Sequence, residues 1–426
     1  MKAPTAIPGP VLRGIPDGQA LPDAPLADGG RLSRLKARRK LWLEAHFWLG
    51  AVASLVLVLA GLTGSALVFW QEIDGWLNPG LHQVQAAPAG RAAYLPLSRL
   101  VEAADAAVPP GARHSTLFYP RHDGLAFWFF YELPVPGQEA ATVLDVFVDP
   151  YSGKVTGTRT WMRPGNPLDL PLVSFLFELH YDLLLGWDKG SWIVGVAGML
   201  AFLSMLTGLI VWWPLTGKWK QALTLKRRAS AERLNHDLHK TFGVYSAAVL
   251  LAVFLSGVYL TFGDQFRGLV GCFSAVTPLK QFKSTPLPGV RPLSLDEAVA
   301  RADGRYPEGR LYWFSVPDSA DGTFVLTRHF DFGGVFMGRR QIVVDQYSGA
   351  ILHVAEPLAG SGGNVFLQWQ WPLHSGQALR MPGRILVSLS GLACAVLFAT
   401  GLIRWLQKRR ARRAVLGRRT VLPGRP

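Results

Sequence analysis

The chain has 426 residues, of which 49% are hydrophobic and 17% are charged, and it contains 15 tryptophans. These proportions predict an integral membrane protein. The formal net charge is +15, but the Lys and Arg residues gather in short segments beside apolar stretches, which argues against a nucleic-acid-binding protein. The only two cysteines, Cys272 and Cys394, are expected at different depths, which argues against a disulfide framework.

Residues 1–34 are rich in Pro, Gly and Ala and lack the apolar core of a signal peptide, so the sequence predicts a disordered tail there. Four later stretches contain no Asp, Glu, Lys or Arg and reach the length of about 20 residues that a membrane-spanning helix needs. These stretches are 47–70, 191–217, 241–263 and 385–403. An even number of spans places both termini on the same side of the membrane.

Basic clusters lie against the ends of these stretches. Six of the ten residues from Arg31 to Lys40 are basic, the loop from Lys218 to Lys240 has seven more, and the tail from Arg404 to Arg419 has eight. The positive-inside rule assigns all three segments, and therefore both termini, to the cytoplasm. Anionic membrane lipid is the expected partner of these residues. Those near the inner helix ends could also neutralise haem propionates, and they include Arg38, Arg39, Lys40 and Lys240. The two long connections then lie on the outer side.

The chain also resembles itself at an offset near 194 residues, which is far too long for a solenoid repeat. His46 corresponds to His239, and His180 corresponds to His374. The segment 146–153, which ends in Asp-Pro-Tyr-Ser-Gly, corresponds to 342–349, which ends in Asp-Gln-Tyr-Ser-Gly. Each half begins in the cytoplasm, so the pattern predicts a parallel internal repeat related by an axis along the membrane normal.

Each outer region is predicted to be a small α+β unit, with one helix followed by strands rich in aromatic and β-branched residues. The predicted helices are 97–107 and 294–302, and the predicted strands are 115–119, 125–133, 142–148, 311–316, 323–329 and 341–344. The segment from Pro171 to Leu185 is apolar but too short to cross the membrane, so we expect an interfacial helix that presents His180.

The predicted fold class is therefore a membrane α-helical protein with four transmembrane helices from a parallel internal repeat and two extracytoplasmic α+β domains. Its predicted segments, in chain order, are a disordered cytoplasmic tail (1–34), the first transmembrane helix (35–70), the first outer domain (71–170), an interfacial helix (171–190), the second transmembrane helix (191–217), a basic cytoplasmic loop (218–238), the third transmembrane helix (239–263), the second outer domain (264–381), the fourth transmembrane helix (382–406) and a basic cytoplasmic tail (407–426).

The four repeated histidines are the candidate site. His46 and His239 both open spans that rise from the cytoplasm, and His180 and His374 both precede spans that descend from outside, so each pair shares one depth. Haem iron takes two axial ligands and imidazole is a normal one, so the pairs predict two bis-histidine haems. A histidine at this depth can instead lie among lipid headgroups or bond a neighbouring carbonyl.

Residues around the predicted ligands leave further alternatives. His236 lies three residues before His239 and is a rival ligand or a neighbour of a haem propionate, but Leu43 takes its place in the first half, which favours His239. Glycines such as Gly64 and Gly257 permit close approach of a helix backbone or of a flat macrocycle.

The Asp-Pro-Tyr-Ser-Gly and Asp-Gln-Tyr-Ser-Gly turns, the His-x-x-x-Gly helix starts at His46 and His239, and the Thr-Gly-Leu helix ends resemble the PepSY-associated transmembrane family over residues 35–410. Some members of that family are ferrisiderophore reductases of the FoxB type in the bacterial inner membrane. The resemblance implies PepSY-like outer domains, two haem b groups among the transmembrane helices, and reduction of ferric siderophores in the periplasm.

Together these features predict a haem-dependent transmembrane ferric reductase, an oxidoreductase that reduces a ferric siderophore or another ferric chelate and so releases iron for uptake. The haems supply the redox chemistry, so no catalytic side chain is assigned. No nicotinamide, flavin or nucleotide motif is present, so the electron donor must come from elsewhere, with quinol in the bilayer and a cytoplasmic reductase as the candidates. Aromatic residues of the outer domains either contact the chelate or pack in the core: Phe118, Tyr119, Trp128, Tyr312 and Trp313.

Two other functions remain open at this point. One is a non-redox PepSY protein that holds a peptide or restrains a protease, in which the histidines only pack. The other is a metal transporter with histidine ligands, which would require carboxylates inside the membrane, and none lies in the four predicted spans.

Overall fold

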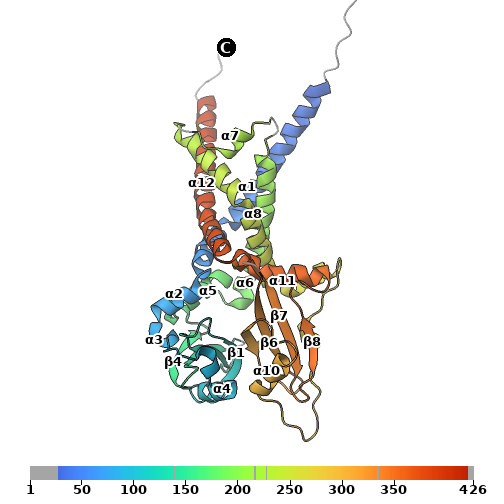
Figure 1. Ribbon diagram of the computed structural model, residues 1–426. Helices are drawn as coiled ribbons and strands as arrows, with labels where there is room; N and C mark the ends of the chain where they lie inside the picture. The colour runs from blue at the N-terminus through green and yellow to red at the C-terminus, as the bar shows by residue number, and fades with distance from the viewer. Residues whose placement is uncertain (1–26, 138–139, 215–216, 227, 333–334, 421–426) are drawn as a thin grey trace, which may run out of the picture.

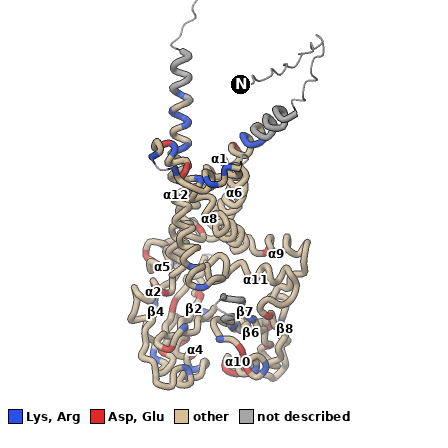
Figure 2. Tube along the Cα trace, turned by 45° about the horizontal axis from the view of Figure 1, so that its top comes forward, with Lys and Arg blue, Asp and Glu red and all other residues tan. Residues whose placement is uncertain are grey.

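The computed structural model describes residues 27–420, apart from 138–139, 215–216, 227 and 333–334. A bundle of long helices stands on a layer of short helices, and a β-sheet with two further helices lies beneath that layer (Figure 1). Lys and Arg residues gather at the end of the bundle away from the sheet (Figure 2). We call these the basic end and the sheet end of the bundle.

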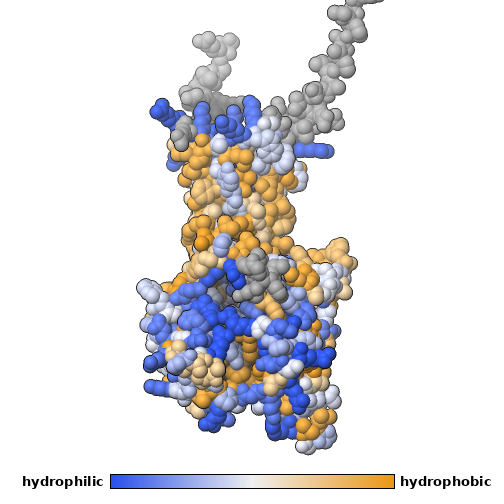
Figure 3. Space-filling view, viewed as in Figure 1, coloured by the Kyte–Doolittle hydropathy of each residue, from blue (hydrophilic) through white to orange (hydrophobic). Residues whose placement is uncertain are grey.

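Four helices form the bundle: α1 (Ala27–Leu67), α6 (Trp187–Trp212), α8 (Ala231–Thr261) and α12 (Arg380–Thr420). Each is long and apolar enough to cross a membrane, as the sequence predicted. Helix α1 packs against α6 and α12, and α8 packs against the same two helices, so the four form a ring. Few residues of their apolar segments are buried, and apolar side chains cover the face of the bundle shown in Figure 3, as expected for a surface that faces lipid.

The bundle helices differ from the predicted spans mainly at their ends. Helix α1 begins at Ala27, inside the predicted disordered tail, and residues 1–26 of that tail lie outside the described residues. Helix α6 ends at Trp212 rather than at residue 217, because Pro214 cannot continue a helix. Helix α8 begins eight residues before His239, where the Ser230 hydroxyl accepts a hydrogen bond from the Arg233 amide and caps the helix. Helix α12 continues through residues predicted as a tail.

The strands form one antiparallel sheet in the order β4-β3-β2-β1-β5-β6-β7-β8. Each half of the chain supplies four of them, and pairing of Leu117 with Phe314 and of Phe118 with Trp313 joins the halves. The sequence predicted two separate units and missed the edge strands β4 and β8. The strands are β1 (Arg113–Phe118), β2 (Phe127–Leu133), β3 (Thr142–Val148), β4 (Val155–Met162), β5 (Arg310–Ser315), β6 (Thr323–Phe332), β7 (Val335–Asp345) and β8 (Ile351–Ala355).

Strand β2 has a core on each of its faces, because successive side chains alternate between them. Phe127, Phe129 and Tyr131 pack beneath α4 (Leu97–Asp105) and α10 (Leu295–Asp303). Trp128 and Phe130 point the other way, toward the short helices that separate the sheet from the bundle. The sheet is therefore fixed to the bundle through an aromatic core.

Short helices lie between the sheet and the bundle and at the basic end of the bundle. The predicted interfacial helix is α5 (Leu172–Tyr181), which packs against α1, and a helix that was not predicted, α11 (Gly362–His374), packs against α8. The remaining ones are α2 (Trp70–Leu77), α3 (Pro79–His82), α7 (Trp219–Leu223), α9 (Gly263–Gly271) and the 3-10 turns Gly90–Ala93, Pro167–Asp169, Leu279–Gln281 and Gln377–Leu379.

Candidate cofactor site: two histidine pairs in the bundle

One histidine pair lies in the half of the bundle nearer the basic end. His46 on α1 faces His239 on α8, with ring centroids 6.1 Å apart and ring planes inclined by 70°. The two residues come from different halves of the chain and are 193 positions apart. Helices α1 and α8 lie across the ring of four from each other, so the pair bridges the centre of the bundle.

A second pair of the same geometry lies at the sheet end. His180, near the end of α5, faces His374, the last residue of α11, and their ring centroids are also 6.1 Å apart, with the planes inclined by 60°. Neither residue belongs to a spanning helix. Helix α5 packs on α1, and α11 packs on α8. Each short helix therefore places its histidine beside the spanning helix from the same half of the chain.

Every ring in these pairs is anchored through the same nitrogen, Nδ1. In the pair nearer the basic end, Nδ1 of His46 lies 2.8 Å from the Ser204 carbonyl oxygen and Nδ1 of His239 lies 2.9 Å from the Thr400 hydroxyl. At the sheet end, Nδ1 of His180 and of His374 lie 2.9 and 3.1 Å from the carbonyl oxygens of Ala60 and Val253. With Nδ1 as donor, Nε2 of each ring keeps a free lone pair, which is the usual state of a metal-ligating histidine.

The ring separations fit a metal held between the two rings. A metal–imidazole bond is about 2.0–2.1 Å long and the ring centre lies about 1.1 Å beyond the nitrogen, so two rings that bind one metal from opposite sides have centroids about 6.2–6.4 Å apart. Both observed separations are 6.1 Å. No group of three or more His, Cys, Asp or Glu that could hold a metal ion occurs among the described residues. Two histidines suit a metal whose other ligands come from a macrocycle, as in haem.

Comparison with known proteins places the chain in a family. The family model described as "PepSY-associated TM region" matches residues 43–408, which include all four histidines and most of the four bundle helices. The chain belongs to the PepSY-associated TM family. No curated protein matches it.

Four glycines make room for the imidazoles in this PepSY-associated TM protein. A Cβ atom at Gly208 would lie 2.9 Å from Cε1 of His46, and one at Gly64 would lie 2.9 Å from Cε1 of His180. At Gly257 the same distance, to Cε1 of His374, is 3.2 Å, and at Gly401, to His239, it is 3.5 Å. Each of these glycines lies on the helix whose backbone or hydroxyl accepts the Nδ1 hydrogen bond. The helices therefore approach the rings of His46 and His180 more closely than an alanine would permit, and at Gly257 the ring of His374 would have to move by a few tenths of an ångström.

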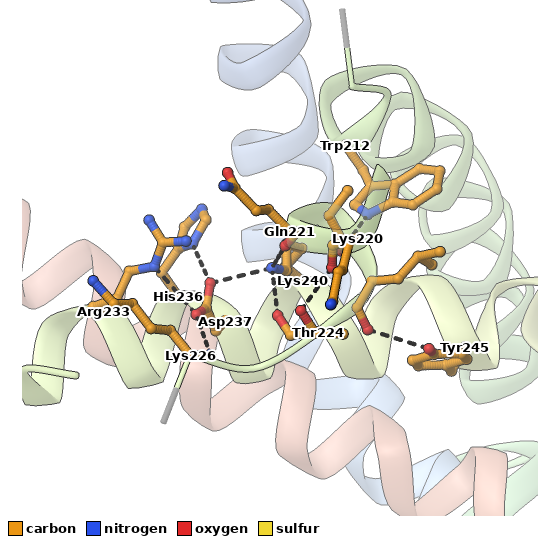
Figure 4. A network of polar contacts seen from close by, with 12 residues as sticks. Trp212, Lys220, Gln221, Thr224, Lys226, Arg233, His236, Asp237, Lys240 and Tyr245 are labelled. Carbon is orange, nitrogen blue, oxygen red and sulfur yellow. Dashed lines mark hydrogen bonds and ion pairs between the residues drawn. The ribbon is translucent and has the colours of Figure 1, made fainter. Parts of the chain in front are cut away.

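His236, the alternative ligand considered from sequence, contacts the carboxylate of Asp237. Its Nδ1 is 3.5 Å from Asp237, and its side chain is 46% exposed. Asp237 itself is fully buried and also contacts Arg233 and Lys240 (Figure 4). The same carboxylate accepts a hydrogen bond from the Lys226 amide, so it ties the loop after α7 to α8 two residues before His239.

Lys240, a predicted partner of haem propionates or lipid, belongs to the network around Asp237. Its ammonium group donates to the carbonyl oxygens of Gln221 and Thr224 as well as to Asp237 (Figure 4). Its position therefore fixes the loop that covers the basic end of α8.

A charged cluster lies at the sheet end, where α12 begins. Arg384 donates to both carboxylate oxygens of Glu72 and to the Val68 carbonyl oxygen. Burial alone would raise the pKa of Glu72, but its hydrogen bond with Arg384 and the nearby charge of Arg121 outweigh that effect and hold the pKa at about 2. Glu72 is therefore ionised at neutral pH and links α2, α12 and the β1–β2 connection.

The aromatic residues singled out from sequence occupy different surroundings. Phe118, Tyr119 and Trp128 line a cavity of about 480 Å³. Tyr312 stacks on His329 with the ring centroids 3.8 Å apart, and Trp313 lies at the β1–β5 junction. Trp70 and Trp161, which the sequence did not single out, pack with Trp128 in one cluster.

Proposed function

We propose that this protein is a haem-dependent electron carrier of the bacterial inner membrane that reduces a ferric siderophore, or another ferric chelate, in the periplasm. The observation that carries the proposal is the pair of histidine sites at matching places in the bundle. In both, the rings come from different halves, have the separation of two axial ligands and are fixed through Nδ1. A role in packing alone requires neither the common separation nor the common orientation.

In this proposal the side chains have distinct roles. His46 and His239 would hold one b-type haem near the cytoplasmic surface, and His180 and His374 would hold a second near the periplasmic surface. When bound, each haem supplies a one-electron redox centre. Hydrogen bonds to Nδ1 keep the rings in the ligating tautomer and raise their basicity. The apolar belt keeps the interior at low dielectric, which favours a buried, delocalised cofactor over free ions.

The orientation follows from charge. Basic residues gather at one end of the bundle, which supports a cytoplasmic position for that end by the positive-inside rule, and the sheet would then lie in the periplasm. Electrons would enter at the cytoplasmic pair from quinol or a cytoplasmic reductase and leave at the periplasmic pair. One electron converts Fe(III) in the chelate to Fe(II), which oxygen ligands bind more weakly, so iron is released.

Anaerobic mixing tests this function directly. Haem-loaded protein is reduced, freed of excess reductant and mixed with a ferric tris-hydroxamate in the presence of a chromogenic Fe(II) chelator. We expect the haem bands to reoxidise while an equal amount of Fe(II) appears. A matched control is the Gly198→Ala variant, whose new Cβ meets Val258 at an ordinary 3.6 Å and should leave the reaction unchanged. Haem bands that stay reduced, or reoxidise without Fe(II), contradict the proposal.

A further inference from the structure

A cavity of about 480 Å³ lies between α2 and the connection from β1 to β2. Its volume falls in the range of roughly 300–1,000 Å³ that is typical of small-molecule sites. Trp128 and Phe118 form apolar walls, and Arg121 and His122 supply polar groups. Trp76 also lines the cavity. This residue is 79% exposed, whereas tryptophan side chains are on average largely buried.

A continuous series of aromatic rings connects this cavity to the histidine pair at the sheet end. Tyr181, next to His180 in sequence, has its ring centroid 5.8 Å from that of His180 and 5.3 Å from that of Phe177. Phe177 lies 5.4 Å from Trp70, and Trp70 lies 5.2 Å from Trp128 in the cavity wall. These separations are those of rings in direct contact. No layer of aliphatic side chains or water needs to be crossed between the histidines and the cavity.

Among the described residues, this series lies in the first half of the sheet. Strands β2 and β6 take matching places, because Phe127 and Phe324 each pair with the valine immediately before an Asp-x-Tyr-Ser-Gly turn. The residue after Phe127 is Trp128, whereas the residue after Phe324 is Val325. The strand forms in both halves, so its folding does not require a tryptophan at this position.

Buried charges contact two residues of the cavity wall, Trp128 and His82. Arg159 donates to Asp74 and to Asp145, and its guanidinium lies over the ring of Trp128 at 5.7 Å. His82 in the cavity wall is 2.6 Å from Asp74. Burial alone would raise the pKa of Asp74, but the hydrogen bonds from His82 and Arg159 outweigh it and hold the pKa below its usual value. This network holds the Trp128 ring in one position.

We propose that the ferric chelate binds in this cavity, packed against Trp76 and Trp128, and that the rings from Tyr181 to Trp70 are the medium through which the electron reaches it. This inference rests on the proposed function. A siderophore-type chelate combines an apolar skeleton with exposed oxygen atoms, which match the tryptophan walls and the Arg121 donors. A haem held by His180 and His374 would supply one electron to the chelated Fe(III), which would give Fe(II) and an oxidised haem with no covalent bond formed or broken.

Binding is tested without any redox chemistry by using the gallium(III) tris-hydroxamate, because Ga(III) has the charge and size of Fe(III) but is not reduced. Calorimetric titration of the purified protein should give a Kd that rises roughly tenfold in Trp76→Ala and in Arg121→Gln. The control is Trp192→Ala, which removes another exposed tryptophan at the sheet end, 58% exposed and outside the cavity lining. Its Kd should equal that of the wild type.

The aromatic path is tested in Trp70→Leu and Trp70→Phe at saturating ferric chelate. We expect severalfold slower haem reoxidation in Trp70→Leu, recovery in Trp70→Phe, and unchanged gallium binding and haem spectra in both. Equal rates in the two variants overturn the path. A Kd within about twofold of wild type in both Trp76→Ala and Arg121→Gln overturns the cavity as binding site. Neither result affects ferric reduction by the wild-type protein. The proposed function itself fails if the wild-type protein binds no haem or reduces no chelate.

Discussion

Under the proposed function, substitution of Gly208 by alanine should remove one haem and leave the other. Gly208 lies on α6 beside the ring of His46, and a Cβ there would be 2.9 Å from Cε1 of that ring. Carbon atoms in contact are normally about 3.5–4.0 Å apart, so the ring must move by about 0.6–1.1 Å. A metal–ligand bond tolerates about 0.2 Å, and binding sites in general about 0.5 Å. The required movement therefore exceeds what ligation permits.

The helix itself should not suffer from this change. Alanine favours a helix interior over glycine by about 1 kcal/mol, so a loss of haem in Gly208→Ala could not be attributed to a weakened α6. Gly198→Ala on the same helix is the matched control, since its Cβ meets Val258 at 3.6 Å. The assay is haem content per chain after purification, with the absorption spectrum of the reduced protein. We expect Gly208→Ala to retain about half of the wild-type haem and Gly198→Ala to retain all of it. Full haem content and unchanged bands in Gly208→Ala would refute the close packing of His46.

Three further predictions concern ligation, pH and the basic end. His46→Ala and His374→Ala should each lose about one haem per chain, measured by haem extraction, and retention of both would contradict the pairing. Burial raises the pKa of Glu72, but the contacts with Arg384 and Arg121 lower it further, to about 2. The ionised Glu72 therefore contributes its full share to stability above pH 4.5, and this share is lost as the pH falls toward 2. The wild-type Tm should therefore fall more steeply than that of Glu72→Gln over this window; parallel curves would contradict this. Asp237→Asn should cost about 1–3 kcal/mol of stability and expose the loop after α7 to protease, and unchanged proteolysis would show that this carboxylate does not hold the loop.

The spans were predictable because their signal is local. Each is a run of about 20 residues without charge, bounded by basic clusters, and the structure confirms four helices of the required length. The depth of each histidine followed from the same topology. That reasoning set His46 against His239 and His180 against His374, and the structure places the rings of both pairs 6.1 Å apart.

The missed elements lack such a local signal. Helix α11 begins with two glycines and contains Pro372, so its sequence is typical of a loop, and packing against α8 stabilises it instead. Strand β4 contains Gly157 and alternates threonine with other residues along a partly exposed edge, which weakens its hydrophobic pattern. The β1–β5 junction pairs residues almost 200 positions apart, and no local pattern sets the register of such a pair.

The residues that contact the four histidines could not be predicted from the sequence either. Gly64 and Gly257 were recognised only as small residues, and the structure sets them against His180 and His374. The carbonyl groups that anchor Nδ1 belong to Ser204, Ala60 and Val253, and every residue carries a carbonyl. Which one meets an imidazole depends on how the helices pack.

The most direct test of the central claim is the haem content and spectrum of the purified wild-type protein after expression with sufficient haem. Coordination by His46 with His239 and by His180 with His374 predicts two b-type haems per chain, both low-spin, with a Soret band and sharp bands on reduction. Protein that contains no haem under these conditions, or whose haem survives loss of all four imidazoles, would contradict the claim.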